Sequence, residues 1–351
     1  AVLVRGPPRP RANGLGGSKN TTERNLMPTA SPQPENQTLA ELCGRGRPRS
    51  VILRLFQEGT VRGLLVGCAM FSILITTLII GILAYETARF LQDVSVVDFL
   101  TGLEWNPLLG ADRHFGIWPL IVGTLLVTLV AAVFALPIGL VTAIFLSEYA
   151  PPWLRAILKP ILEVLAGIPT VVYGFFALIV ITPALQGLGR LVTGENTFGA
   201  YSAGAAGIAV GIMILPIVTS LSEDAIRAVP KGLRDGAFAL GSTKFDTSVK
   251  VVVPAALSGI MASYLLAITR AVGETMIVAL AAGGLAQMTV LPWEQVQTMT
   301  AYMVQIFLGD APATGVEYKS SFAVAGVLFL MTFLLTFAGY RILLRFREEY
   351  E

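Results

Sequence analysis

Six long apolar segments alternate with more polar stretches along the chain. Each is long enough to cross about 30 Å of hydrocarbon, since a transmembrane helix needs about 20 predominantly apolar residues. The segments lie near residues 64–84, 118–146, 157–182, 201–222, 255–285 and 321–343. Pro137, Pro169 and Pro216 fall within the second, third and fourth, which membrane helices tolerate when neighbours bond the freed carbonyls. The pattern predicts an all-α polytopic membrane protein with six transmembrane helices.

The composition agrees with this pattern and sets the amino-terminal part apart from the rest. Hydrophobic residues make up 54% and charged residues only 14% of the 351 residues, which is too apolar for a soluble domain. Residues 1–50 are rich in Gly, Pro, Ser, Asn and Arg, so we expect a disordered basic tail. Residues 51–62 are a possible interfacial helix. The transmembrane domain then occupies residues 63–347, and nucleic-acid binding is not expected of it.

The basic residues orient the predicted helices. Loops on the cytoplasmic side of a membrane carry an excess of Lys and Arg. With both termini inside, twenty of the 25 basic residues fall on the cytoplasmic side and four on the opposite side, while Arg270 lies within the fifth segment. The sequence therefore predicts that both termini and the loop 223–254 are cytoplasmic.

The loop 223–254 is a polar island between two apolar segments. Residues from Ala225 to Leu240 carry apolar side chains at helical spacing, and Pro230 predicts a break within them. Gly241 is a suitable stop, because glycine tolerates the left-handed conformation that ends many helices. So short a helix has too little apolar area to fold alone, and we expect it to bind in a groove of a partner.

The same loop contains a spaced motif. Asp235, Gly236 and Ala237 are followed after three residues by Gly241, and Pro254 closes the stretch behind two valines. This spacing resembles the cytoplasmic loop signature of the permeases of ABC importers, with mild departures at four positions. The resemblance implies the type I ABC-importer permease fold and a groove that belongs to an ATPase subunit. We expect Asp235 to anchor the loop by hydrogen bonds.

Three further stretches, residues 115–148, Glu163 to Gly174 and Thr269 to Met276, resemble permeases of phosphate importers. The long outer segment that contains Trp105 favours the C-type subunit. The resemblance implies a permease of an ATP-driven importer of inorganic phosphate in a bacterial plasma (inner) membrane, which forms the translocation path with a second, A-type permease. It also implies a dimer of ATPase subunits, coupled through the 225–246 loop, and an external phosphate-binding protein.

Arg270 and Glu274 lie within the fifth apolar segment, one helical turn apart on one predicted face. A charge at membrane depth costs at least ~2.5–3.5 kcal/mol on insertion scales, so neither is expected there alone. Paired, they are about neutral, and the guanidinium matches the oxygens of phosphate. The resemblance implicates Arg270 and Glu274 in transport, and we place Thr269 and Thr275 beside them on the substrate path. A static ion pair that locks this helix to a neighbour is the alternative.

The outer segment, residues 85–117, carries Phe99, Trp105 and Phe115 among acidic residues. Such aromatic rings can cap the bundle at the membrane interface or contact a binding protein, and capping is the expected role. His114 is the only histidine, which excludes catalytic or metal-binding histidine pairs. We expect a transport subunit with no enzymatic activity, no cofactor and no metal, and ATP hydrolysis by a partner.

Two other functions stay open. A permease for another oxyanion, such as molybdate, sulfate or phosphonate, would carry the same loop, because specificity resides mostly in the binding protein. An ATP-independent channel or secondary transporter has support only from the predicted pair of Arg270 and Glu274, and the loop signature argues against it.

Overall fold

The computed structural model describes residues 48–107, 113–194, 197–309 and 315–345. The predicted tail at 1–50 lies outside the described residues except for its last three positions. Two compact units divide between Ser72 and Ile73, and the second contains every element beyond the middle of the first long helix.

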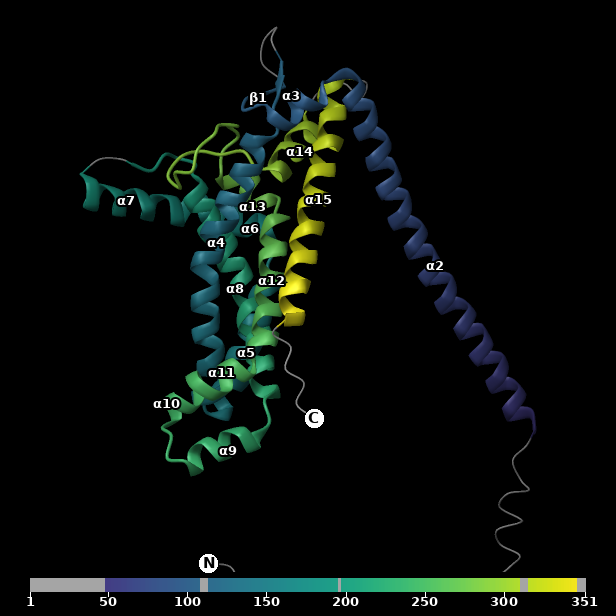
Figure 1. Ribbon diagram of the computed structural model, residues 1–351, viewed down its shortest axis with the longest axis vertical. Coiled ribbons are helices and arrows are strands. Elements are labelled where there is room, and N and C mark those ends of the chain that lie inside the picture. The colour runs from purple at the N-terminus through teal and green to yellow at the C-terminus, as the bar shows by residue number, and fades with distance from the viewer. Residues whose placement is uncertain (1–47, 108–112, 195–196, 310–314, 346–351) are drawn as a thin grey trace, which may run out of the picture. The chain divides into compact units, whose positions relative to one another are not determined.

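Helices make up most of the described chain (Figure 1). The first half contains α2 (Pro48–Asp93), α3 (Val96–Thr101), α4 (Trp118–Ile144), α5 (Pro152–Ala166), α6 (Thr170–Phe176), α7 (Thr182–Thr193) and α8 (Ala203–Ala228). The second half contains α9 (Lys231–Ala239), α10 (Lys244–Thr247), α11 (Val253–Ala255), α12 (Leu257–Val272), α13 (Met276–Ala281), α14 (Met299–Leu308) and α15 (Val316–Arg345). The π-helical turns η1 (Phe145–Tyr149), η2 (Ala177–Ile181) and η3 (Ser248–Val252) join neighbouring helices, and the strands β1 (Trp105–Asn106) and β2 (His114–Phe115) pair antiparallel.

The helices α4, α8 and α12 lie side by side and form the centre of the bundle (Figure 1). Small residues let them approach closely: a Cβ added at Gly207 of α8 would lie 2.6 Å from the side chain of Val130 in α4. A Cβ added at Gly259 of α12 would lie 2.4 Å from that of Ala225 in α8. Close approach of this kind holds helices together in lipid, where van der Waals packing replaces the hydrophobic effect.

The structure confirms the predicted all-α polytopic fold. Five described helices are long and apolar enough to cross a membrane, and there are six spans if the bent pair Lys244–Ala255 and Leu257–Val272 counts as one. Residues 51–62 are not a separate interfacial helix, because α2 runs without a break from Pro48 to Asp93.

The predicted third span, 157–182, has the wrong bounds. The apolar helix in this region is Thr170–Val192, and α5 before it is a separate helix with no buried residue. Pro169 stands directly before α6 rather than inside a helix. Proline lacks an N–H and disfavours the helical conformation at the residue before it, so the chain breaks here.

The predicted fifth span, 255–285, is wrong as a single helix. The helix α12 ends at Val272 and α13 begins at Met276. On its other side, α12 meets the helix Lys244–Ala255 at an angle of 69°. These breaks place Glu274 between two helices instead of within one.

Aromatic rings close the end of the bundle that carries α3 and β1. Trp105 packs edge-on against Tyr302 with ring centroids 4.9 Å apart, and Phe90 packs in the same way against Phe99 and Phe115 at 5.4 and 5.5 Å. All five rings are buried. The outer aromatic residues therefore pack inside this end of the bundle, and their capping role at the membrane interface stays a prediction.

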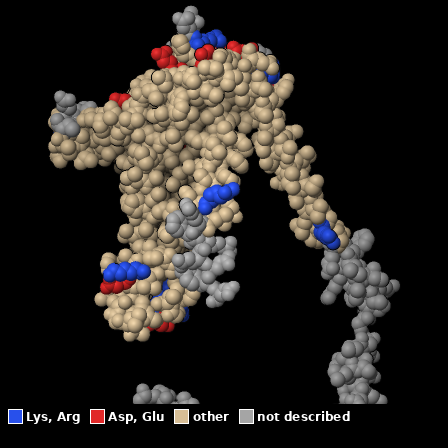
Figure 2. Space-filling view, in the orientation of Figure 1, with Lys and Arg blue, Asp and Glu red and all other residues tan. Residues whose placement is uncertain are grey.

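Charged side chains are unevenly distributed over the bundle. On the face shown in Figure 2, they gather mainly at the end that carries β1 and α3 and at the end that carries α9 and α10. The surface between these ends is almost free of charge. A protein surrounded by hydrocarbon requires such a surface, because charged groups there are costly.

Candidate functional site

The helix α9 lies between the predicted break at Pro230 and the predicted stop at Gly241, whereas residues 225–228 belong to the end of α8. Pro230 stands directly before it and prevents α8 from continuing. At its other end Gly241 has a φ of +84°. The N–H of Gly241 donates to the carbonyl of Phe238 at 3.0 Å, and that of Ser242 donates to Ala237 at 3.1 Å. These two bonds form a Schellman motif, which requires the left-handed conformation at Gly241.

The loop around α9 exposes large apolar side chains. The only residue that α9 buries is Ala237, whereas Leu240 is 90% exposed and Phe238 and Phe245 are exposed as well. Gly236 and Pro254 of the motif are also exposed. Clustered apolar side chains on a surface indicate a protein interaction site.

Asp235 does not anchor the loop, contrary to our expectation. Its side chain is exposed and forms no hydrogen bond or ion pair with any described group. The residue before it, Arg234, has this role instead, because the helical turn points its side chain toward the bundle, where it is only 16% exposed.

All three guanidinium nitrogens of Arg234 are used. Its Nε and Nη2 donate to Oε1 of Glu148 in η1, at 3.2 and 3.0 Å. Its Nη1 donates to the carbonyl of Val229 at 2.6 Å, and Nη2 also donates to that of Ile226 at 2.8 Å. Ile226 lies in the last turn of α8 and its carbonyl also accepts from the N–H of Val229 at 3.3 Å, while Val229 directly follows the helix. One side chain thus joins α9 to the ends of two central helices.

A second charged cluster joins α5 to α8. The carboxylate of Glu223 is fully buried and lies within ion-pair distance of Arg155 at 3.3 Å, Lys159 at 3.1 Å and Arg227 at 3.5 Å. An unpaired carboxylate here would carry a large desolvation penalty, which the three cations offset. Its Oε1 accepts no hydrogen bond from a described group. Lys159 donates to Asp224 at 2.7 Å, and this bond raises the pKa of Lys159 above its ordinary value.

The predicted pair of Arg270 and Glu274 is not formed. Arg270 lies in the last turn of α12, and its exposed side chain has no ion-pair or hydrogen-bond partner in the described part of the chain. Glu274 is only 8% exposed. Its Oε1 accepts hydrogen bonds from the N–H groups of Met276 at 3.1 Å and Ile277 at 3.3 Å, so its carboxylate caps α13. The hydroxyl of Thr300 donates to its backbone carbonyl at 2.6 Å.

The two threonines predicted on the substrate path bond to local backbone. Thr269 donates to the carbonyl of Leu265 at 2.8 Å, and Thr275 donates to that of Gly273 at 3.3 Å. Of the four predicted path residues, Arg270 alone presents a charged group without a partner among the described residues.

Arg234 and Glu223 were not predicted as anchors. A signal for Glu223 was present, because it is the first charged residue after the uncharged stretch 196–222. A charge at the border of an apolar segment requires a partner when the helix end packs against another element. No comparable signal marks Arg234, since its charged partner Glu148 lies 86 positions earlier in the chain.

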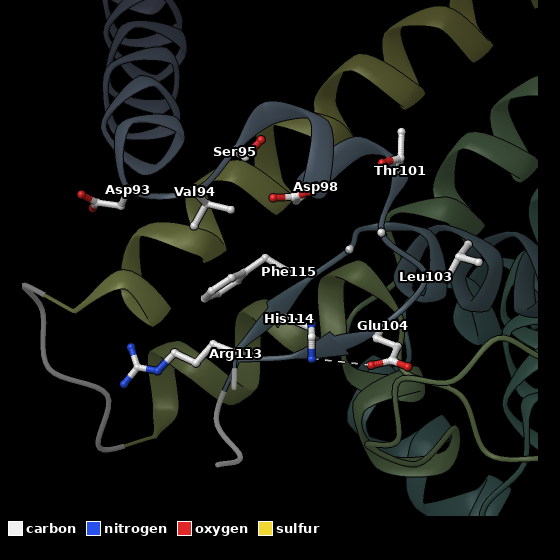
Figure 3. Close-up of a pocket in the computed structure, with 12 residues that line it drawn as sticks. Asp93, Val94, Ser95, Asp98, Thr101, Leu103, Glu104, Arg113, His114 and Phe115 are labelled. Carbon is white, nitrogen blue, oxygen red and sulfur yellow. Dashed lines mark ion pairs between the residues drawn. The ribbon is translucent and has the colours of Figure 1, made fainter. Parts of the chain in front are cut away.

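A cavity of about 680 Å³ opens beside α3 and the β1–β2 pair, at the end of the bundle far from α9 (Figure 3). Asp93, Asp98 and Glu104 line it together with Arg113 and His114. Nε2 of His114 lies 3.8 Å from Oε2 of Glu104, as the dashed line marks. Three carboxylates against one arginine do not suit the binding of an anion, so this cavity is not the candidate substrate site.

Comparison with known proteins identifies the class. Residues 135–348, more than half of the chain, match the family described as the binding-protein-dependent transport system inner membrane component. With the helical bundle and the exposed α9 loop, this match defines the protein as a permease subunit of an ABC importer. Such permeases work with another permease, an ATPase and a substrate-binding protein. The chain belongs to the family of binding-protein-dependent transport system inner membrane components.

Individual relatives agree with this family. The chain is 35% identical to the probable ABC transporter permease protein YqgH of Bacillus subtilis, over 86% of this chain and 94% of that protein. It is 32% identical to the phosphate transport system permease protein PstC of Mesorhizobium japonicum, over 81% of this chain and 92% of that protein. A chain of a bacterial ABC transporter for the acidic polysaccharide alginate superposes with a TM-score of 0.56 at 14% identity, over 84% of this chain and 100% of that chain, a likeness of fold alone.

Proposed function

We propose that this chain is the C-type permease subunit of an ATP-driven importer of inorganic phosphate and forms the translocation path with a second, A-type permease. Relatives named phosphate transport system permease protein PstC support the substrate, at 32% identity over 72% and 81% of the chain. In this proposal the protein lies in a bacterial plasma (inner) membrane with both termini and α9 in the cytoplasm. The predicted distribution of its basic residues, with twenty on the cytoplasmic side and four on the opposite side, supports this orientation.

The observation that carries the substrate proposal is Arg270. Its guanidinium extends from the last turn of α12 and has no partner among the described groups of this chain. It can donate two parallel hydrogen bonds to phosphate oxygens, which a lysine cannot do. A single cation also permits release, because a transported ion must leave as well as enter.

Glu274 has a different role in this proposal from the one that the sequence suggested. Its carboxylate is occupied by the N–H groups at the start of α13, so it does not compete with phosphate for Arg270. It fixes the break that follows α12 and thereby positions the helix end that carries Arg270. Thr269 and Thr275 line the path beside Arg270 through their methyl groups, since both hydroxyls bond to backbone.

The coupling loop 225–246 completes the proposal. The exposed side chains of Phe238, Leu240 and Phe245 dock in a groove of the ATPase dimer, and hydrolysis moves this loop. An external phosphate-binding protein delivers the ion to the opposite end of the bundle. ATP hydrolysis itself belongs to the partner.

The test is uptake of radiolabelled phosphate by the complete complex in vesicles, with its binding protein and ATP. We expect ATP-dependent uptake of phosphate and little uptake of molybdate, sulfate or phosphonate at equal concentration. Preferential uptake of one of these other oxyanions would assign the permease to that ion. Uptake that persists without ATP would instead support a channel or secondary transporter.

A further inference from the structure

We propose that Arg234 is the positioning residue that passes movement of α9 to the ends of α4 and α8. The inference rests on the coupling role proposed for the 225–246 loop. It assigns the connection to a residue outside the spaced motif and to Glu148, which lies 86 positions earlier in the chain.

Apolar packing alone does not hold α9 in place. Among its described residues only Ala237 is buried, and no heavy atom lies within 4 Å of a Cβ added at Gly232 or Gly236. Pro230 joins α9 to α8 along the chain, and α9 also contacts η3 and α10. The four hydrogen bonds of Arg234 are the polar contacts that connect α9 to η1 and to the end of α8.

The geometry is specific to arginine. Its donors form a rigid planar fork, and here they point to two elements at once, a carboxylate of η1 and two carbonyls at the end of α8. Glu148 is 12% exposed, so water competes weakly for this charge-assisted bond. A lysine in place of Arg234 could reach one of these acceptors but could not hold all three in fixed directions.

A second contact reaches the same π-helical turn from the other side of the loop. Nζ of Lys244 lies 4.9 Å from the ring centroid of Tyr149, in a cation–π contact. The turn η1 is itself held by Arg155, which donates to the carbonyls of Leu146 and Ser147. The end of α4 is therefore the point where the coupling loop, α5 and α8 meet.

The experiment compares Arg234→Gln, Glu148→Gln and the double variant in the complete reconstituted complex, with Arg234→Lys as the conservative change. Lys250→Gln is the matched control, because Lys250 lies in the same polar stretch, residues 223–254, and its ion pair with Asp246 is exposed. Three quantities are measured: the ATPase that co-purifies, the stimulation of ATP hydrolysis by the binding protein, and the ATP hydrolysed for each phosphate taken up.

We expect Arg234→Gln to retain the ATPase, since the exposed docking residues are unchanged, but to hydrolyse at least about tenfold more ATP for each ion transported. Glu148→Gln should have a smaller effect, because the two carbonyl contacts remain. The double variant should hydrolyse no more ATP for each ion than Arg234→Gln does. The ratio for Arg234→Lys should lie between those of the native complex and Arg234→Gln, and Lys250→Gln should have the native ratio.

Two results would overturn the inference. A native ratio of ATP to phosphate in both single variants would show that the contact transmits nothing. The variant Leu240→Asp, which places a charge at an exposed docking position, serves as the reference for loss of the ATPase. An equal loss of the ATPase from Arg234→Gln would show that Arg234 only shapes the docking surface. If the Arg234→Gln protein does not accumulate in the membrane, the ratio of ATP to phosphate in the Glu148→Gln complex tests the inference instead. If the native complex takes up no phosphate, the proposed substrate fails, and the stimulation of ATP hydrolysis still tests Arg234.

Discussion

Replacing Gly241 with valine tests the most local feature of the coupling loop. The residue adopts a φ of +84°, and no heavy atom lies within 4 Å of a Cβ added there. The effect of a side chain is therefore conformational rather than a collision. An L-residue in the left-handed region costs roughly 1–2 kcal/mol, and a β-branched one is least suited to it. This free energy corresponds to a factor of about 5–30 in the population of the native turn.

The expected result is weaker binding of the ATPase by that factor, because the Schellman bonds at Phe238 and Ala237 fix the direction in which Leu240 points. The affinity of the ATPase for the purified permease complex measures it directly, together with phosphate uptake. Membrane insertion should be unchanged.

Two further variants separate conformation from bulk. Gly232→Val adds the same side chain to helical backbone, again with no heavy atom within 4 Å of the new Cβ, and should bind the ATPase almost normally. Gly241→Asn should lose less affinity than Gly241→Val, because asparagine tolerates the left-handed conformation better than most residues. Native affinity in Gly241→Val, or equal losses in Gly232→Val and Gly241→Val, would refute the reasoning.

The remaining predictions concern the tail, the path and the core. Deleting residues 1–50 should leave assembly and uptake largely intact, because their sequence carries too little apolar surface to offset the entropy of ordering; loss of either would reveal a partner for this tail. The Arg270→Gln complex should assemble, but its uptake should fall at least tenfold, which corresponds to a transport barrier raised by about 1.4 kcal/mol. Uptake at the native rate would exclude Arg270 from the path. Gly207→Leu should destabilise the protein by about 1–3 kcal/mol in thermal unfolding, since its Cβ would meet Val130 at 2.6 Å, whereas Gly187→Leu on an open surface should have little effect.

The local features of the coupling loop were predictable from the sequence. Pro230 and Gly241 act on the backbone of their own residues and immediate neighbours, so their effects do not depend on the rest of the fold. The structure shows the predicted break before α9 and the predicted stop after it. The apolar segments were likewise visible, because length and hydropathy determine which helices can span a membrane.

The breaks in the third and fifth spans were not predictable from hydropathy. The peptide groups around Gly273 leave the helical pattern because the Glu274 side chain bonds to the N–H groups at the start of α13, and because Thr300 bonds to its carbonyl. The partner from α14 lies 26 residues away. Periodicity alone therefore placed Arg270 and Glu274 on one face and suggested an ion pair that the structure does not contain.

These contacts also indicate which parts of the bundle can move together. Close approaches of small residues join α4 to α8 and α8 to α12, and the hydroxyls of Ser222 and Ser263 add a hydrogen bond of 2.8 Å between the latter pair. Helices packed this closely resist sliding, because a shift brings the backbone of one helix against the side chains of the other. A displacement delivered through Arg234 to the ends of α4 and α8 would therefore carry α12 with them, and with it Arg270. In the proposed transport cycle, the surface that opens and closes is then the one between this three-helix unit and the second permease, rather than a gate within the chain itself.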